Sequence, residues 1–263
     1  MRRPIITLLT DFGTQDHYVA TMKGVILGIN PQCTLIDITH EVTPHKIEEG
    51  AFVLANAYSY FPKGTIHLAV VDPGVGSGRK PILLVTRDHF FVGPDNGLLT
   101  LAVQKERVRE GIGITNETFF LSQISTTFHG RDVFAPVAAH LSLGIRPSLL
   151  GQKLDSWVTL DFEEPGIIGG DLVGQVVHID AFGNLVSNIR ESQLLQFSQG
   201  RPCMIKTGGK GITGLKKGYW EGKKGALMAV IGSGGLLEIS VREGSAQKAL
   251  KLKRGAKIKV IVR

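Results

Sequence analysis

Short apolar runs alternate with amphipathic stretches along the first 150 residues. The apolar runs, which have the length and composition of buried strands, are IITLLT (5–10), TLIDITH (34–40), TIHLAVVD (65–72) and ILLVTRD (82–88). The stretches that we predict to be helices are HYVATMKGVILGIN (17–30), KIEEGAFVLANAYSYF (46–61), LLTLAVQKE (98–106) and RDVFAPVAAHLSLG (131–144). We expect Asp16 to cap the first helix and Pro136 to interrupt the last. This alternation predicts an α/β domain with a mostly parallel sheet and helices on both faces.

The pattern changes between residues 150 and 170. An acidic passage with Gly and Pro, LDSWVTLDFEEPGIIGGD, leads into a region rich in strand-like segments separated by glycines. We therefore expect an α/β domain over 1–155, a linker over 156–170 and a compact antiparallel barrel or sandwich over 171–263.

Charge and cysteine usage limit the possible partners. The 263 residues carry a formal net charge of +7, much of it in the final segment KALKLKRGAKIKVIVR. That segment has no aromatic residue to stack on a base, so a solvated basic face is favoured over a nucleic-acid site. Cys33 and Cys203 form no CxxC motif, which favours a reduced, cytoplasmic protein without a thiolate zinc site. No signal peptide or membrane-spanning stretch is evident, so we expect no membrane partner.

The glycine-rich segment DPGVGSGRK (72–80) follows a predicted strand but is not a phosphate loop. A phosphate loop needs GxxxxGK[ST] at a helix start, whereas Lys80 is followed by Pro81 and another strand. We expect the glycines to form a tight turn that brings Asp72 and Arg79 together.

Polar residues follow three predicted strands of the first domain, namely Asp11, His40 and Asp72. Ligands of open α/β sheets bind beyond the carboxyl ends of the strands, so a site is expected at this edge. The alternative is that each residue only caps a loop.

The segment FHGRDVFAP (128–136) adds His129 to the candidates. Asp132 is explained as an acid in the first helical turn, a role that does not need His129. Gly130 could leave room for a ligand and Phe128 could stack on one. A purely structural histidine is the alternative.

Two turns in the second half carry further candidates. In DAFGNLVSNI (180–189), Asp180, Phe182 and Asn184 suit a ribose, a ring face and an amino-acid head group. A plain hairpin turn explains them equally well. In IGSGGLLEIS (231–240), Ser233 and Glu238 flank a similar turn. No His and Asp cluster has metal-ligand spacing, so no metal site is predicted.

Seven motifs in this order resemble one enzyme family. They are TDFGTQDHYVATMKGVI, ITHEVTPH, VVDPGVGSGR, GPDNGLLT, FHGRDVFAP, DAFGNLVSNI and GSGGLLEIS. Together they resemble the S-adenosylmethionine hydroxide adenosyltransferases, also called S-adenosylmethionine hydrolases, whose relatives halogenate the same substrate. The resemblance runs from about residue 5 to the end.

The resemblance implies hydrolysis of S-adenosylmethionine to adenosine and methionine by attack of water or hydroxide on the ribose 5′ carbon. It implies a C-terminal β-barrel, no cofactor, and a homotrimer whose active sites lie between subunits. The family's catalytic triad maps onto Asp72, Arg79 and His129. The residues implied to bind substrate are Asp11 at the ribose, with Asp180 as a second candidate, and Phe182, Asn184, Ser233 and Glu238.

Departures from the halogenating relatives favour hydrolysis. The segment before GPDNGLLT is compact where the fluorinating relatives have a long insertion, and His45 replaces an aromatic residue. Gly234 replaces an arginine, and the carboxylate of Asp72, which would repel halide, replaces an aromatic residue. A halide-using enzyme and a non-catalytic nucleoside-binding protein remain the alternatives, and the sequence leaves both sulfonium epimers open as substrates.

Overall fold

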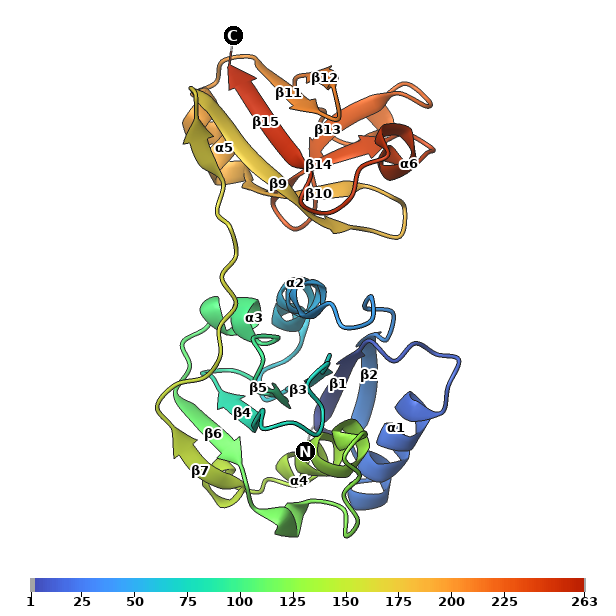
Figure 1. Ribbon diagram of the computed structural model, residues 1–263, viewed down its shortest axis with the longest axis vertical. Coiled ribbons are helices and arrows are strands. Elements are labelled where there is room, and N and C mark those ends of the chain that lie inside the picture. The colour runs from blue at the N-terminus through green and yellow to red at the C-terminus, as the bar shows by residue number, and fades with distance from the viewer. Residues whose placement is uncertain (1–2, 263) are drawn as a thin grey trace. The chain divides into compact units, whose positions relative to one another are not determined.

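The chain folds into two units, and the described residues form two hydrophobic cores in the first unit and one in the second. The structure is a computed structural model that describes residues 3–262 (Figure 1). The units span Met1–Asp161 and Phe162–Arg263, so their boundary falls inside the segment 156–170.

One seven-stranded sheet forms the centre of the N-terminal unit. Its strands in the described residues are β1 (Ile5–Thr10), β2 (Thr34–Thr39), β3 (Ile66–Val70), β4 (Pro81–Val85), β5 (Phe90–Pro94), β6 (Glu110–Ile114) and β7 (Gly151–Leu154), in the order β2-β1-β3-β5-β4-β6-β7. The pairs β1–β2, β1–β3 and β3–β5 are parallel. Because β4 runs antiparallel to both β5 and β6, β6 points the same way as β5, and only β4 and β7 oppose the rest. The predicted mostly parallel sheet is confirmed.

The sequence pattern does not predict β5, β6 and β7. Their segments FFVGP, EGIGI and GQKL are short and contain Gly or Pro, which have low strand propensity. No helix separates β4 from β5, and the two form an antiparallel hairpin instead of a crossover. Pairing with neighbouring strands, and not local propensity, makes these segments strands.

Helices cover both faces of this sheet (Figure 1). They are α1 (Tyr18–Ile29), α2 (Ile47–Ala57), α3 (Thr100–Gln104) and α4 (Ala135–Ser142). Successive strand residues point to opposite faces. Ile6 and Leu8 therefore join the core that contains Met22 of α1, while Leu9 joins a second core with Leu54 of α2. The predicted helices on both faces are confirmed.

Of two expectations about helix ends, the Asp16 cap is wrong and the interruption at Pro136 takes another form. α1 begins at Tyr18 after His17 without any side-chain cap, and Asp16 is exposed. Pro136 is the second residue of α4, which continues directly from the π-helical turn η3 (Gly130–Phe134). The carbonyl oxygen of Asp132, four residues before Pro136, accepts from Leu121 N at 2.9 Å, because the proline has no N–H to donate. The predicted interruption is therefore a change of helical type next to Pro136, after which α4 continues to Ser142.

The C-terminal unit is an antiparallel, barrel-like sheet, as predicted. Its strands in the described part of the chain are β8 (Gly166–Ile168), β9 (Asp171–Ile179), β10 (Leu185–Arg190), β11 (Cys203–Thr207), β12 (Lys210–Thr213), β13 (Leu227–Ile231), β14 (Leu236–Val241) and β15 (Lys257–Val262). The order is β12-β11-β15-β9-β10-β14-β13, with β8 beside β9. Just after β12, the N–H of Lys216 donates to Ala229 O of β13 at 2.8 Å, which links the two ends of this order. Two short helices, α5 (Glu191–Ser198) and α6 (Ala246–Leu250), accompany the sheet.

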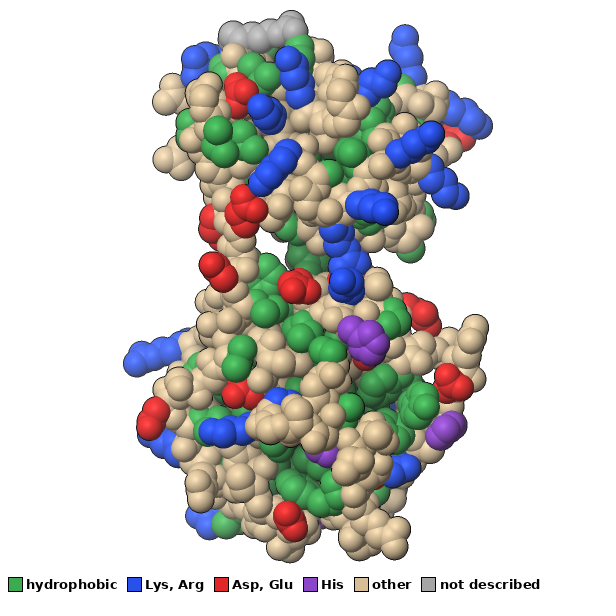
Figure 2. Space-filling model, viewed as in Figure 1, with side chains coloured by type: hydrophobic (Ala, Val, Ile, Leu, Met, Phe, Trp, Pro, Cys, Tyr) green, Lys and Arg blue, Asp and Glu red, His purple; other side chains and the backbone are tan. Residues whose placement is uncertain are grey.

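Lysine and arginine side chains gather on the visible face of the C-terminal unit (Figure 2). In β15, the exposed Lys257 and Lys259 alternate with the buried Ile258 and Val260. The basic C-terminal segment therefore has a structural explanation as the outer side of a barrel strand. Among residues 3–262, no helix has the length and apolar character needed to cross a bilayer.

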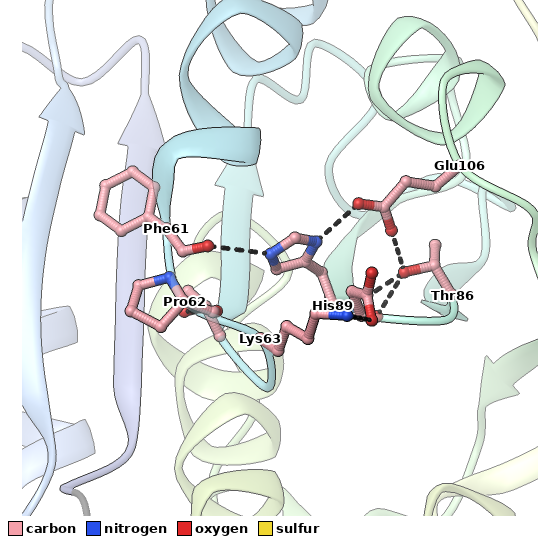
Figure 3. Close-up of polar contacts among 8 residues, drawn as sticks. Phe61, Pro62, Lys63, Thr86, His89 and Glu106 are labelled. Carbon is pink, nitrogen blue, oxygen red and sulfur yellow. Dashed lines mark hydrogen bonds and ion pairs between the residues drawn. The ribbon is translucent and has the colours of Figure 1, made fainter.

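A buried polar cluster lies where β3 and β5 begin, at the sheet edge opposite the carboxyl ends of these strands. His89 Nδ1 is 2.7 Å from Glu106 Oε1, and His89 Nε2 is 3.3 Å from the carbonyl oxygen of Phe61 (Figure 3). The Thr86 hydroxyl donates to Glu106 Oε2. His67 packs beside His89, with ring centroids 5.2 Å apart. These hydrogen bonds satisfy the polar groups of Thr86, His89 and Glu106. His67 Nδ1 lies 2.8 Å from the Thr7 hydroxyl, whereas His67 Nε2 is buried without a partner among the described residues.

Candidate active site

Polar side chains follow three adjacent strands at one edge of the N-terminal sheet. Asp11 follows β1, His40 follows β2, and Asp72 lies two residues beyond β3. Because β1 pairs in parallel with both β2 and β3, these three strand ends lie at the same edge. His40 is buried, with Nδ1 2.8 Å from the Thr10 hydroxyl, so it contributes to the structure of this edge.

Asp72 and Arg79 form a buried ion pair across the glycine-rich turn, as the sequence predicts. Arg79 Nε donates to Asp72 Oδ2 at 2.8 Å, and Arg79 Nη2 contacts the same oxygen. The side chains are only 5% and 9% exposed. Gly76 makes the turn possible, because its φ is +76° and a Cβ there would lie 2.2 Å from the carbonyl oxygen of Thr126.

His129 completes a cluster with this pair. Its Nδ1 lies 3.0 Å from Arg79 Nη2. A guanidinium only donates hydrogen bonds, so Nδ1 accepts and the proton of the neutral ring lies on Nε2. Burial lowers the pKa of His129, and the nearby Arg79 lowers it further, while Asp72 and Asp132 oppose the shift. The arrangement therefore favours a neutral imidazole that can donate through Nε2.

Two polar atoms of the Asp72–Arg79 pair are buried without a hydrogen-bond partner among the described residues. They are Asp72 Oδ1, an acceptor, and Arg79 Nη1, a donor. Buried polar atoms are normally satisfied, so each such atom requires an explanation. A small polar molecule such as water could bond to either of them.

The π-helical turn η3 (Gly130–Phe134) packs against the Arg79 side chain of the cluster. The Arg79 guanidinium lies over the buried Phe134 ring, 5.1 Å from its centroid. Asp132 is fully buried, and its carboxylate accepts from Ser125 N at 2.8 Å and from Nε of its sequence neighbour Arg131 at 2.6 Å. Asp132 lies in the first turn, as expected, and it also anchors the loop before His129.

Gly130 and Phe128 do not leave the ligand space that the sequence suggested. Phe128 is buried, with ring centroids 5.8 Å from Phe12 and 5.1 Å from Tyr18. A Cβ at Gly130 would lie 3.3 Å from atoms of Met22, Phe12 and Phe128. Neighbouring side chains fill this space, so both residues serve packing.

Asp11 is half-buried and fixed by a backbone contact that the sequence does not reveal. Its Oδ2 accepts from the His45 N–H at 2.8 Å. His45 has a φ of +67°, a left-handed conformation that is uncommon outside glycine. The backbone of His45 therefore orients the Asp11 carboxylate.

In the C-terminal unit, Asp180 and Asn184 form a closed turn. Asp180 Oδ1 accepts from the N–H groups of Phe182 at 3.0 Å and Asn184 at 2.8 Å, and the Asn184 side-chain amide donates to Asp180 Oδ2 at 2.8 Å. Asp180 and Asn184 thus shape a turn between β9 and β10 whatever else they do. Phe182, at the tip of this turn, is 78% exposed.

Glu238 lies beside this turn and is paired with a residue that sequence reasoning missed. The Tyr219 hydroxyl donates to Glu238 Oε2 at 2.9 Å. Burial raises the pKa of Glu238, and Asp180 raises it further, although the Tyr219 bond lowers it. Burial and then Glu238 raise the pKa of Tyr219 to about 12. The structure thus brings Asp180, Tyr219 and Glu238 together.

Ser233 is exposed in the turn between β13 and β14. Its neighbour Gly232 approaches Glu238 so closely that a Cβ would lie 1.7 Å from Oε1. Trp220, next to Tyr219, is 69% exposed. The aromatic pair YW between glycines in KKGYWEG is the sequence signal that could have identified these two residues.

Comparison with known proteins connects this geometry to a family. Residues 6–151 match the model of the SAM hydroxide adenosyltransferase N-terminal domain, and residues 174–259 match that of its C-terminal domain. An (R)-S-adenosyl-L-methionine hydrolase of Methanocaldococcus jannaschii is 40% identical over 98% of this chain and 95% of its own length.

A crystal structure of an uncharacterized conserved protein from Thermotoga maritima superposes with a TM-score of 0.92 at 39% identity, covering 97% of this chain and 99% of that one. The fluorinase of Nocardia brasiliensis is more distant, at 27% identity over 99% of this chain and 98% of its own.

Proposed function

Since the chain belongs to the S-adenosylmethionine hydroxide adenosyltransferase family, we propose that it hydrolyses (R)-S-adenosyl-L-methionine to adenosine and methionine. The near full-length match to a relative of that name supports both the reaction and the epimer. One structural observation carries the proposal. Asp72 Oδ1 is a buried acceptor without a partner among the described residues, in a cluster with the donors Arg79 and His129.

The reaction is an in-line displacement at the ribose 5′ carbon. Water forms the new carbon–oxygen bond while the carbon–sulfur bond breaks and its electron pair passes to sulfur. The sulfonium thereby becomes the neutral thioether of methionine, so the leaving group needs no general acid and the reaction needs no cofactor. The proton lost by water passes to Asp72 and then to solvent.

Each member of the cluster has a distinct part. Asp72 Oδ1 accepts a hydrogen bond from the attacking water and then its proton, a contribution of roughly 10²–10⁴-fold in rate. Arg79 holds Asp72 in place through Oδ2. His129 Nδ1 accepts a hydrogen bond from Arg79, so the ring carries its proton on Nε2. His129 therefore donates a hydrogen bond to the water through Nε2 and orients it, and it does not act as the base. Alignment of the water with the 5′ carbon and exclusion of bulk water lower the activation free energy by up to about 7–11 kcal/mol more.

Substrate binding is assigned to the remaining candidates. Asp11, fixed by the His45 N–H, holds the ribose hydroxyls and thereby the 5′ carbon. The residues proposed to contact the nucleoside and the methionine portion are Asp180, Phe182, Asn184, Ser233 and Glu238. The 78% exposure of Phe182 supports a role in contact with a ligand or a partner.

The protein is further proposed to act as a homotrimer with active sites between subunits. Candidate residues in both units and exposed aromatic side chains on the C-terminal unit support a shared site. Mixing Asp72→Ala subunits with Asn184→Ala subunits tests this. Activity should return on subunit exchange if each site combines two chains, and should stay absent if each chain holds a whole site. Light scattering gives the mass of the assembly.

No nucleic-acid or membrane partner is proposed, and we assign the protein to the cytoplasm. Cys33 and Cys203 are both buried and free of disulfides, which supports a reducing compartment.

Isotope labelling tests the reaction itself. The protein is incubated separately with each sulfonium epimer in oxygen-18 water, and products are followed by chromatography and mass spectrometry. Adenosine release should be faster with the (R) epimer, and the label should appear in adenosine. Label in methionine would exclude attack at the 5′ carbon, and no adenosine from either epimer would leave only a nucleoside-binding protein.

Incubation with chloride or fluoride addresses the halogenating alternative. The Asp72 carboxylate beside the reacting carbon should repel halide, so no halogenated nucleoside is expected. Its appearance would place the chain with its fluorinase relatives.

A further inference from the structure

The segment that follows β5 contacts both ends of the glycine-rich turn. The backbone N–H of Asp95 donates to the carbonyl oxygen of Lys80 at 2.8 Å. The side-chain amide of Asn96 donates to the carbonyl oxygen of Val71 at 2.9 Å. Lys80 and Val71 are the residues next to Arg79 and Asp72, so two consecutive residues fasten both halves of the ion pair.

Sheet geometry explains why Val71 needs this contact. The parallel ladder of β3 and β5 ends at the pair Leu68 and Val92. Val71 lies beyond that ladder but is fully buried, and a buried carbonyl without a donor would be costly. The Asn96 side chain supplies the donor that the ladder no longer provides.

The orientation of the Asn96 amide is determined by its other partner. Asn96 Oδ1 accepts from the N–H of Leu98 at 3.1 Å, so the nitrogen must face Val71. The Asp95 side chain is also engaged, because its Oδ1 accepts from Val158 N at 2.7 Å. Asn96 is therefore held at both ends, between the turn and the start of α3.

We propose that Asn96 is a positioning residue for the reaction, and that it acts through the Val71 carbonyl to set the direction of the Asp72 carboxylate. This inference rests on the proposed function. Asp72 follows Val71 directly, so a shift of the Val71 peptide turns Oδ1 away from the attacking water. Misplacement of a reacting group by about 1 Å can cost on the order of a hundredfold in rate.

Asn96→Asp and Asn96→Leu test the proposal. Asn96→Asp keeps an oxygen for Leu98 N but removes the donor to Val71, whereas Asn96→Leu removes both groups without adding charge. Both variants should lower kcat by about tenfold to a hundredfold with little change in KM.

Asn56 offers a matched control. Its side-chain amide donates to the carbonyl oxygen of Phe52 at 2.8 Å within α2, so its hydrogen bond is not to the Asp72–Arg79–His129 cluster. Asn56→Asp and Asn56→Leu should leave kcat unchanged. Wild-type kcat in both Asn96 variants, with only a lower melting temperature, would show a purely structural role and overturn the proposal.

A readout without turnover separates this inference from the proposed function. The nitrogen-15 resonance of His129 Nδ1 reports its hydrogen bond to Arg79. It should move in both Asn96 variants and stay in place in the Asn56 variants. An unmoved resonance would overturn the positioning role even if the enzyme works as proposed. If the wild type releases no adenosine, this resonance still decides whether Asn96 orders the cluster.

Discussion

Arg79 Nη2 lies 3.0 Å from His129 Nδ1, so the side chain that holds Asp72 also fixes the tautomer of the histidine. Nδ1 is an acceptor in this contact, and a proton there would point at a guanidinium. Protonation of His129 therefore breaks the cluster as well as adding charge to it. Burial lowers the pKa of His129, so it also favours the neutral ring.

This relationship predicts the acid side of the pH profile. His129 is neutral above its lowered pKa, so the midpoint of the acid limb of kcat should lie below the ordinary value of histidine, as the ring gains its proton. His129→Gln presents an oxygen to Arg79 and an N–H₂ group to water without titrating in this range. It should keep partial activity and lose this acid limb. The same limb in the variant would assign the titration to another group.

Removal of the Asp72 carboxylate should separate catalysis from binding. Asp72→Ala should reduce turnover by a hundredfold or more while calorimetry still detects adenosine binding. It also leaves Arg79 buried without its counter-ion, which should cost about 3–5 kcal/mol in the free energy of unfolding.

The exposed ion pair of Arg190 with Glu164 serves as the control for the stability effect. Glu164→Ala should change the free energy of unfolding by less than about 1 kcal/mol, because both side chains are more than half exposed.

Wild-type turnover in Asp72→Ala would remove Asp72 from the mechanism.

The left-handed backbone of His45 predicts a contrast between two substitutions. His45→Gly and His45→Val both lose the imidazole and keep the N–H that donates to Asp11. Glycine adopts a φ of +67° freely, whereas a β-branched residue rarely does. KM for the substrate should stay near the wild-type value in His45→Gly and rise in His45→Val. Equal effects in both variants would point to the imidazole and not to the backbone.

Buried His67 predicts a loss of stability in acid. Burial, with a smaller contribution from His89, lowers the pKa of His67 to about 3, against an unfolded value near 6.5. Between these values the unfolded chain binds a proton that the folded chain does not, so stability rises with pH across this window. The slope from one such group is about 1.4 kcal/mol per pH unit.

Urea unfolding of wild type and His67→Gln between pH 4 and 6.5 measures this slope. Other titrating groups, including His89 and Glu106 near the ring, are common to both proteins, so the difference isolates His67. The stability gap between wild type and variant should narrow as pH falls. A gap independent of pH would mean that His67 accepts its proton in the folded state.

Much of the fold class follows from local patterns. The apolar runs that became β1, β3 and β4 are buried because each offers consecutive large side chains to cores on both faces of the sheet. The pairing of Asp72 with Arg79 could also be predicted from the sequence, because a glycine-rich turn of eight residues brings its two ends together. Both inferences could be made from the pattern of residues close together in the sequence.

Tertiary structure decided what depends on distant segments. Strands β5, β6 and β7 exist because neighbouring strands supply their hydrogen bonds, and Gly130 lacks free space because Phe12 and Met22 fill it. The sequence by itself determined the two kinds of domain and the chemistry at the strand ends. The contacts that orient this chemistry, from His45 to Asp11 and from Asn96 to Val71, emerged only on folding. The reason is physical, since a hydrogen bond between residues 25 or 34 positions apart depends on how the whole sheet brings them together.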